Sequence, residues 1–267
     1  MIVQKLLRRA VGERLRSAPT KAPDDRPKAA LIFGVGAPAG IGAAVARRAS
    51  EGGLAVFVCG RSADKLERTA TAIRESGGQA TAVVADASDA EQIAAAFRQV
   101  DQAGFALELV VHNVGSNRPA PFLQIKAEQL ERSWRADCLS GFFVGQQAIK
   151  AMQPNGRGSV IFTGASASLR GKAGFAEFAM SKAGLRSLAQ SMARDFGPKG
   201  IHVAHVVIDG MVNGDRLRRL APDLLDRQGL DGALSPDAIA TCYWRLHQQH
   251  RSAWTHELDL RPFAENW

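Results

Sequence analysis

The amino-acid sequence predicts an α/β fold, in which helices cover both faces of a mainly parallel, doubly wound sheet of about seven strands. Short apolar segments alternate along the chain with longer amphipathic segments. A glycine cluster follows the first apolar segment, where a tight turn into a helix would be needed. The length of 267 residues suits one large domain, and no internal repeat is visible.

The expected strands are short apolar segments of the kind that parallel sheets bury on both faces: residues 29–33, 54–59, 80–85, 107–112, 158–163 and 201–208. The expected helices follow the strands and repeat apolar residues at helical spacing: residues 41–50, 63–76, 89–102, 127–151 and 175–196. A last strand is expected within residues 254–263, whose charges and tryptophan indicate an ordered, packed terminus.

Residues 1–27 are expected to form a basic N-terminal extension with a proline-rich linker, and residues 28–267 the folded domain. Residues 1–28 hold eight lysines and arginines against three acidic residues, so most of the net charge of +8 lies there. Residues 2–16 have the spacing of an amphipathic helix, which would either pack on the domain or make weak contact with a membrane surface.

Composition excludes several function classes. The chain after the extension is only mildly basic and carries no nucleic-acid-reading motif, so specific binding of nucleic acid is not expected. Cys59, Cys138 and Cys242 lack the spacing of metal ligands, and unpatterned thiols fit a reducing, cytoplasmic compartment. No apolar run approaches the ~18 residues of a membrane span, and charged residues interrupt any secretory signal at the N-terminus.

The glycine cluster predicts a Rossmann-like binding site for a dinucleotide. Its glycines let a pyrophosphate approach the backbone, and the next helix presents free N–H groups and the positive end of its dipole to that anion. The position after a buried strand distinguishes this turn from a purely structural one. The residues expected to contact the cofactor here are Gly36, Pro38, Ala39, Gly40, Ile41 and Gly42.

The end of the second strand favours NADP(H) over NAD(H), which is the alternative. No acidic residue is present there to bind a ribose 2′-hydroxyl, and the Arg61 guanidinium suits a 2′-phosphate. A solvated arginine at a helix start is the competing interpretation. Further cofactor contacts are expected beyond the carboxyl ends of the strands, from Ser62, Asp86, Ala87, Asn113, Val114, Gly115, Lys182 and Gly210.

Together these motifs resemble those of the short-chain dehydrogenase/reductase family, over roughly residues 28–215. The resemblance also rests on Ser181-Lys182-Ala183-Gly184 and on the run from Ala193 to Val203. It implies a small-molecule substrate and a homodimer or homotetramer formed through the two long helices.

The resemblance fails at three of the four positions that carry the family's catalysis, which uses an Asn, a Ser, a Tyr and a Lys. In that family the tyrosine protonates the carbonyl oxygen as hydride arrives, and the lysine lowers its pKa. Lys182 is present, but Phe178, Ala165 and Cys138 stand at the Tyr, Ser and Asn positions. The only tyrosine, Tyr243, lies far downstream. Ordinary tyrosine-assisted ketone reduction is therefore not expected.

Other groups are candidates for handling a proton: Lys182, Ser166 beside the serine position, and His112. An ordinary imidazole titrates near neutral pH, although a hydrogen-bonded structural histidine is the alternative for His112. Asp209, where the family has a proline, either takes part or caps the following turn.

Three functions therefore stay open. The first is an NADP(H)-binding oxidoreductase that reduces a small apolar substrate, at an iminium carbon or an activated alkene, without the usual tyrosine acid. The second is a catalytically silent NADP(H)-binding protein that acts as a sensor or partner subunit. The third is a redox-neutral cyclase or isomerase, with Phe178 and Ala165 lining an apolar pocket.

Residues 211–234 are expected to form a lid over the substrate. They hold Arg216, Arg218, Arg219 and Arg227. These arginines either attract an acidic substrate or form a solvated helix face.

Overall fold

The computed structural model describes residues 24–115 and 117–264, so the predicted helix at 2–16 lies outside the described residues. Seven parallel strands form one sheet in the order β3-β2-β1-β4-β5-β6-β7. Their bounds are β1 (Lys28–Phe33), β2 (Ala55–Gly60), β3 (Ala80–Val84), β4 (Ala106–His112), β5 (Gly158–Thr163), β6 (Ile201–Ile208) and β7 (Glu257–Leu260). The predicted α/β fold class is confirmed. The strand order reverses between β1 and β4, which is where ligands bind in sheets of this kind.

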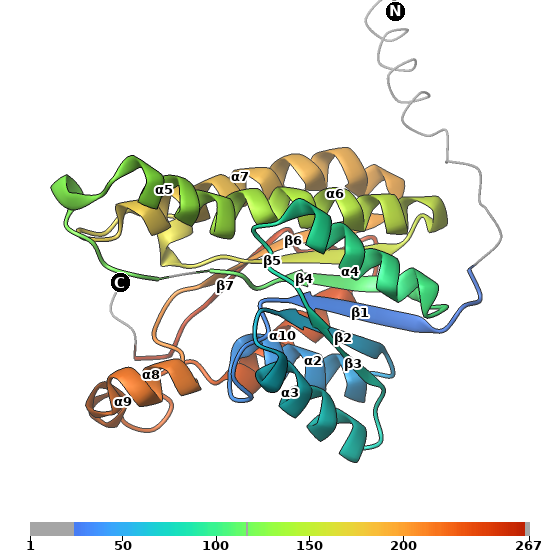
Figure 1. Cartoon of the computed structure of the whole chain (residues 1–267), viewed down its shortest axis with the longest axis horizontal. Helices are drawn as coiled ribbons and strands as arrows, with labels where there is room; N and C mark the ends of the chain where they lie inside the picture. The colour runs from blue at the N-terminus through green and yellow to red at the C-terminus, as the bar shows by residue number, and fades with distance from the viewer. Residues whose placement is uncertain (1–23, 116, 265–267) are drawn as a thin grey trace, which may run out of the picture.

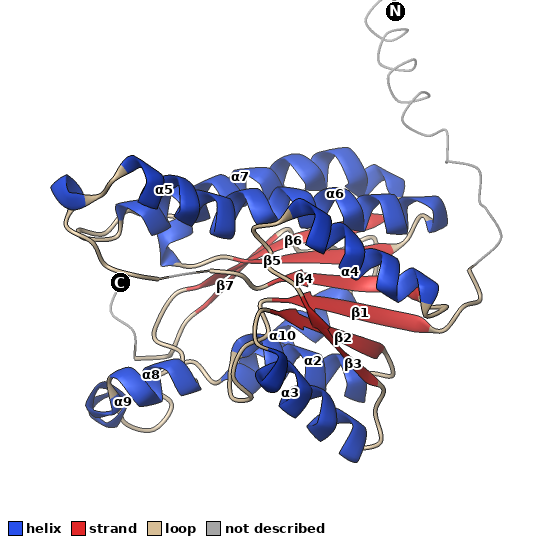
Figure 2. Cartoon of the chain, viewed as in Figure 1, coloured by secondary structure: helices blue, strands red, loops and turns tan. Residues whose placement is uncertain are grey.

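Helices cover both faces of this sheet (Figures 1 and 2). One face carries α2 (Ile41–Glu51), α3 (Ala63–Glu75) and α10 (Pro236–His247). The other carries α4 (Ala90–Gln102), α6 (Ser140–Met152) and α7 (Ala176–Phe196). The short α5 (Ala127–Trp134) precedes α6, whereas α8 (Asp215–Leu220) and α9 (Pro222–Gln228) lie beyond one end of the sheet.

The continuous apolar sequence of the strands follows from burial on both faces. In β1, Leu31 and Phe33 join the core under α4, α6 and α7, while Ala30 and Ile32 join the core under α2, α3 and α10. Because side chains alternate along a strand, no position from Ala29 to Phe33 can be polar without disturbing one of the two cores.

The helix expected over residues 127–151 is present and contains a π-helical turn. A five-residue π-helical segment, Arg135–Leu139, separates α5 from α6 and buries Asp137 and Cys138. Ser140 stabilises the restart of the helix by donating from Oγ to the Ala136 carbonyl at 2.6 Å. The predicted helix is therefore present over its whole length, and only its π-helical turn was not foreseen, because one inserted residue barely changes the apolar spacing of the sequence.

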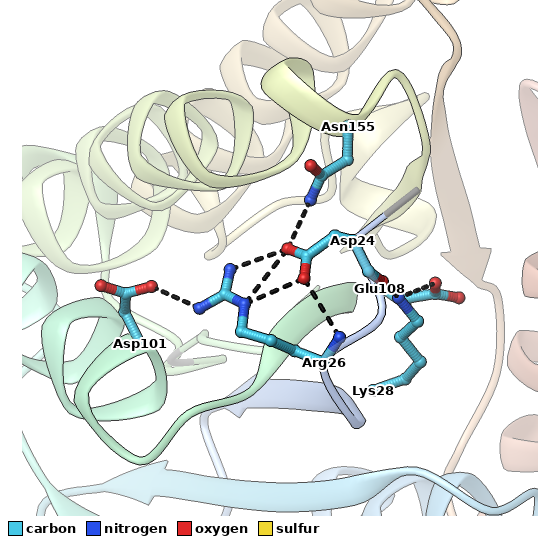
Figure 3. A network of polar contacts seen from close by, with 6 residues as sticks. All are labelled: Asp24, Arg26, Lys28, Asp101, Glu108 and Asn155. Carbon is cyan, nitrogen blue, oxygen red and sulfur yellow. Dashed lines mark hydrogen bonds and ion pairs between the residues drawn. The ribbon is translucent and has the colours of Figure 1, made fainter. Parts of the chain in front are cut away.

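The segment just before β1, which sequence analysis assigned to the linker, is tied to the domain by polar contacts (Figure 3). Arg26 pairs with Asp24 at 2.8 Å, and Asn155 donates to the same Asp24 carboxylate at 3.0 Å. Lys28 lies 3.7 Å from Glu108 on β4. This network sits where the strands begin, so it fixes the start of the sheet and lies away from their carboxyl ends.

Four imidazoles lie in the core or close to it: His112 in β4, His202 and His205 in β6, and His247 at the end of α10. Burial lowers the pKa of His205 and His247 to about 4 and that of His112 to about 3. The folded protein therefore resists protonation that the unfolded chain accepts near its ordinary value of 6.5.

We predict that the free energy of unfolding is fully retained above pH 6.5 and falls as the pH drops from 6.5 towards 4. The unfolded chain binds more protons than the folded one in that window, which costs up to ~1.4 kcal/mol per pH unit for each buried imidazole. Urea unfolding between pH 7.5 and 4.5 measures the slope. His247→Gln should flatten it, whereas the exposed His250→Gln should not; a stability constant over that range would contradict the burial.

Candidate functional site

The turn between β1 and α2 is packed tightly against the end of β4. Gly34 has a φ of +82°, and a Cβ there would lie 2.2 Å from the Asn113 carbonyl oxygen. A Cβ on Gly42 would lie 2.9 Å from the Gly34 oxygen, to which the Asn113 side chain donates at 3.2 Å. Gly34, which sequence analysis did not include among the site residues, is thus the glycine that this junction requires most.

The same turn is open on its other side. A Cβ on Gly36 would meet nothing within 4 Å, and Gly40 offers no side chain to cap α2. The first turn of α2 contains no acidic residue. The first N–H groups of a helix have no partners within it, so this end suits an anion such as a pyrophosphate. The residues present fit the dinucleotide that the sequence predicts.

The ends of β2 and β3 present the residues expected near the adenosine half. Arg61 and Ser62 are exposed directly after β2. Asp86, after β3, is half-buried and accepts hydrogen bonds from Ser88 N at 2.9 Å and Ser88 Oγ at 2.8 Å, while Ala87 is buried. The guanidinium is therefore free to meet solvent and ligands, whereas Asp86 also holds its own loop.

Lys182 on α7 is the central residue of the part of the site where the family's catalytic residues would lie. Its Nζ donates to the Val114 carbonyl at 2.9 Å and to the Thr163 carbonyl at 2.8 Å, and it is 3% exposed. Burial lowers the pKa of Lys182 to about 8, opposed by the nearby Asp137 carboxylate. A Cβ on Gly115 would lie 3.1 Å from Nζ, so the glycine keeps this approach possible.

The substituted positions surround this lysine. The Phe178 ring centre lies 5.8 Å from Lys182 Nζ, one turn earlier on α7. The Cys138 thiol is buried, and burial raises its pKa while the Lys182 charge opposes that rise. Ala165 follows β5, and its N–H donates to Ser168 Oγ at 3.1 Å. The edge of the site facing Lys182 therefore carries an aromatic ring and a methyl group where the resemblance implies hydroxyls.

Two candidates lie inside the core. His112 is fully buried, with Nε2 2.8 Å from Ser140 Oγ, so the expectation that it titrates near neutral pH is wrong. Tyr243 on α10 is also fully buried and donates to Thr163 Oγ1 at 2.9 Å. Because α10 and α7 cover opposite faces of the sheet, Tyr243 does not replace the missing tyrosine.

Asp209 and Ser166 lie in the loops beyond the sheet. Asp209 is buried and forms ion pairs with Arg170 at 2.9 Å and with Arg261 at 3.1 Å. Asp209 therefore holds together the loops that follow β5 and β7, which is a structural role. Ser166 is half-buried at the start of a short 3-10 turn.

Residues 211–234 close over this end of the sheet. A bridge between Val212 and Leu234 joins the two ends of the segment. Arg216 donates to the Asn117 carbonyl at 2.8 Å, and Arg218 lines a cavity of about 340 Å³ beneath α9. The α8 helix thus spans the mouth of the site, consistent with the lid that sequence analysis expects.

Other classes of site find no support in residues 24–115 and 117–264. No three His, Cys, Asp or Glu side chains gather there in a way that would hold a metal ion. No helix in that part of the chain combines the length and apolar character that crossing a membrane requires.

Comparisons with known proteins agree with this geometry. The family model for short chain dehydrogenases matches residues 28–224. A 1-cyclohexenylcarbonyl-CoA reductase from Streptomyces collinus is 32% identical over 195 residues, which are 72% of this chain and 68% of the relative.

Solved structures show the same likeness. A short-chain dehydrogenase from Rhodopseudomonas palustris is 35% identical, with a TM-score of 0.76 over 88% of this chain and 99% of that one. A metagenomic short-chain oxidoreductase in complex with NADP is 26% identical, with a TM-score of 0.75 over 88% of this chain and 97% of that one. With the parallel sheet, the glycine turn and the buried lysine in place, the chain belongs to the short-chain dehydrogenase family.

Proposed function

We propose that this protein is an NADP(H)-dependent reductase that adds hydride to a carbon–carbon double bond conjugated with a carbonyl group. One observation carries the proposal: the Phe178 ring faces Lys182, where the family's acid would stand, while the cofactor end of the site is intact. A site of this kind suits hydride transfer that needs no hydroxyl acid at a carbonyl oxygen.

The residues that would hold the cofactor lie along the carboxyl edge of the sheet. The N-terminus of α2 and the open side of Gly36 suit its pyrophosphate. The exposed Arg61 suits a 2′-phosphate. The relative solved with NADP supports the choice of cofactor. When bound, the cofactor supplies the hydride; the remaining steps fall to the protein.

In conjugate reduction the negative charge develops on an enolate, which Lys182 can stabilise. Hydride adds to the β carbon, the π electrons move toward the carbonyl to form an enolate, and a proton then adds to the α carbon. Lys182 has three N–H donors, of which two go to backbone carbonyls, and within residues 24–115 and 117–264 the third is left to stabilise the enolate or deliver the proton. Its pKa of about 8 makes it an effective acid near neutral pH.

The relatives and the lining favour an apolar acyl substrate. The name of the Streptomyces collinus relative specifies a ring double bond conjugated with a thioester carbonyl. Phe178 offers an aromatic surface beside Lys182, and Ala165 adds a methyl group in the loop after β5. Such a surface stabilises an apolar substrate by excluding water.

We further propose that the protein is a homodimer or homotetramer. Trp134, Phe142 and Met180 are 43%, 41% and 56% exposed on α5, α6 and α7, the side on which the family resemblance implies contact. Light scattering after size exclusion should give a dimer or tetramer mass for the wild type and a smaller mass for Phe142→Arg. A monomeric wild type would contradict this.

Replacing Arg61 should separate the two cofactors. Arg61→Ala is expected to weaken NADPH binding by about tenfold or more, the factor for losing a hydrogen-bonded charge pair, and to leave NADH binding nearly unchanged. Fluorescence titration measures both dissociation constants. Arg68→Ala, an exposed arginine on α3, is the matched control; equal losses for both cofactors would reject the assignment of NADP(H).

Lys182 should control the pH dependence of turnover on an α,β-unsaturated thioester. The rate is expected to fall as the pH rises through about 8, because Lys182 then loses the proton it donates. Lys182→Ala should abolish turnover, while Lys150→Ala, exposed on α6, should not change it. An unchanged rate in Lys182→Ala would remove this residue from the mechanism.

Restoring the missing hydroxyls should add a second activity. The double variant Phe178→Tyr with Ala165→Ser is expected to reduce simple ketones, which the wild type should leave unreacted, because a tyrosine there would lie beside Lys182. NADPH consumption with a ketone panel measures the gain. Ketone reduction by the wild type would show that another group supplies the acid.

A further inference from the structure

The glycine turn between β1 and α2 is contacted by a carboxylate of the protein itself, that of Asp215. The backbone N–H of Ala39 donates to Asp215 Oδ2 at 3.0 Å. Ala39 immediately precedes Gly40, the N-cap residue of α2. Asp215 is the first residue of α8, so the lid reaches the glycine turn through a carboxylate.

The backbone beside Asp215 is equally close to the turn. A Cβ on Gly214, the residue that precedes α8, would lie 3.0 Å from the Ala39 carbonyl oxygen. At the other side of the site, Arg216 donates to the Asn117 carbonyl in the loop after β4. Two neighbouring residues at the start of α8 therefore contact two separate loops.

A carboxylate in this place competes with a phosphate. Both are anions that accept from backbone N–H groups at the positive end of a helix, and one N–H makes only one strong bond of this kind. Their like charges also repel across a partly buried site. The Asp215 side chain is half-buried, so water screens that repulsion only in part.

We propose that Asp215 is an internal competitor for the cofactor's phosphate, which latches the α8 lid shut on the glycine turn until the dinucleotide displaces it. This inference rests on the proposed binding of NADP(H). The apparent affinity for the cofactor is then reduced in proportion to the fraction of molecules whose latch is open.

The α8 helix also carries a positive side chain, Arg218, close to the glycine turn. Arg218, one turn along α8, lines a cavity of about 110 Å³ together with Ala39 and Asn213. Arg218 donates from Nε to Asn213 Oδ1 at 2.8 Å and is exposed at this rim. While the lid is closed, this guanidinium lies on the same cavity as Ala39, where it favours the approach of a phosphate towards the turn.

The test compares Asp215→Asn and Asp215→Ala with wild type, in the full chain, by NADPH titration and stopped-flow association. Both variants should bind NADPH about tenfold more tightly, the factor for one hydrogen bond to a charged group, mainly through faster association. Asp223→Asn removes one charge from the exposed face of α9 and should change neither quantity. Thermal unfolding of each variant confirms that it is folded.

Three results would overturn the latch: unchanged affinity, weaker binding, or an equal gain in Asp223→Asn, which would indicate a general charge effect. Inorganic pyrophosphate separates this failure from failure of the proposed function. If no form binds NADPH, yet Asp215→Asn binds pyrophosphate more tightly than wild type, the cofactor assignment is wrong and the competition stands. If pyrophosphate binding is also unchanged, both are wrong.

Discussion

The arrangement of the reacting half depends on how one buried charge is satisfied. An ammonium group in the interior is tolerated only when strong acceptors replace its water, and Lys182 has the carbonyls of Val114 and Thr163. Val114 follows β4 and Thr163 ends the neighbouring β5, so the bonds pin α7 to the carboxyl edge of the sheet. The segment after β4, which also packs against the glycine turn, is thereby held from both sides.

This constraint explains how a site can keep its architecture while its chemistry changes. The lysine is needed to hold α7 and the strand ends together, whatever stands at the tyrosine position. Phe178 fills the volume of the lost ring and keeps a face toward the ammonium, an arrangement with weak attraction of its own. Cofactor binding depends on the β1–α2 turn instead, and none of the substitutions touches it. Binding and proton transfer are thus separable properties of this fold.

The lid, residues 211–234, affects only the binding of the cofactor. Its contacts with Ala39 and Asn117 are individual hydrogen bonds, the first partly buried and the second exposed, and single bonds of this kind can exchange with a ligand. Its two ends are joined by the bridge between Val212 and Leu234, so α8 and α9 form a loop closed at its base. Movement of this loop need not disturb the sheet or Lys182.

The alternation of strands and helices, the glycine turn and the pairing of Phe178 with Lys182 can all be read from local sequence patterns. Each follows from local spacing, since residues four apart share a helix face and strands that alternate with helices lie parallel. Such patterns did not determine the π-helical insertion at Arg135–Leu139, the burial of His112 and Tyr243, or the ion pairs of Asp209. These depend on which surfaces meet when layers pack. The contact between Asp215 and Ala39 joins residues 176 positions apart. Only tertiary structure could decide it, because no local pattern specifies which carboxylate will reach a distant N–H.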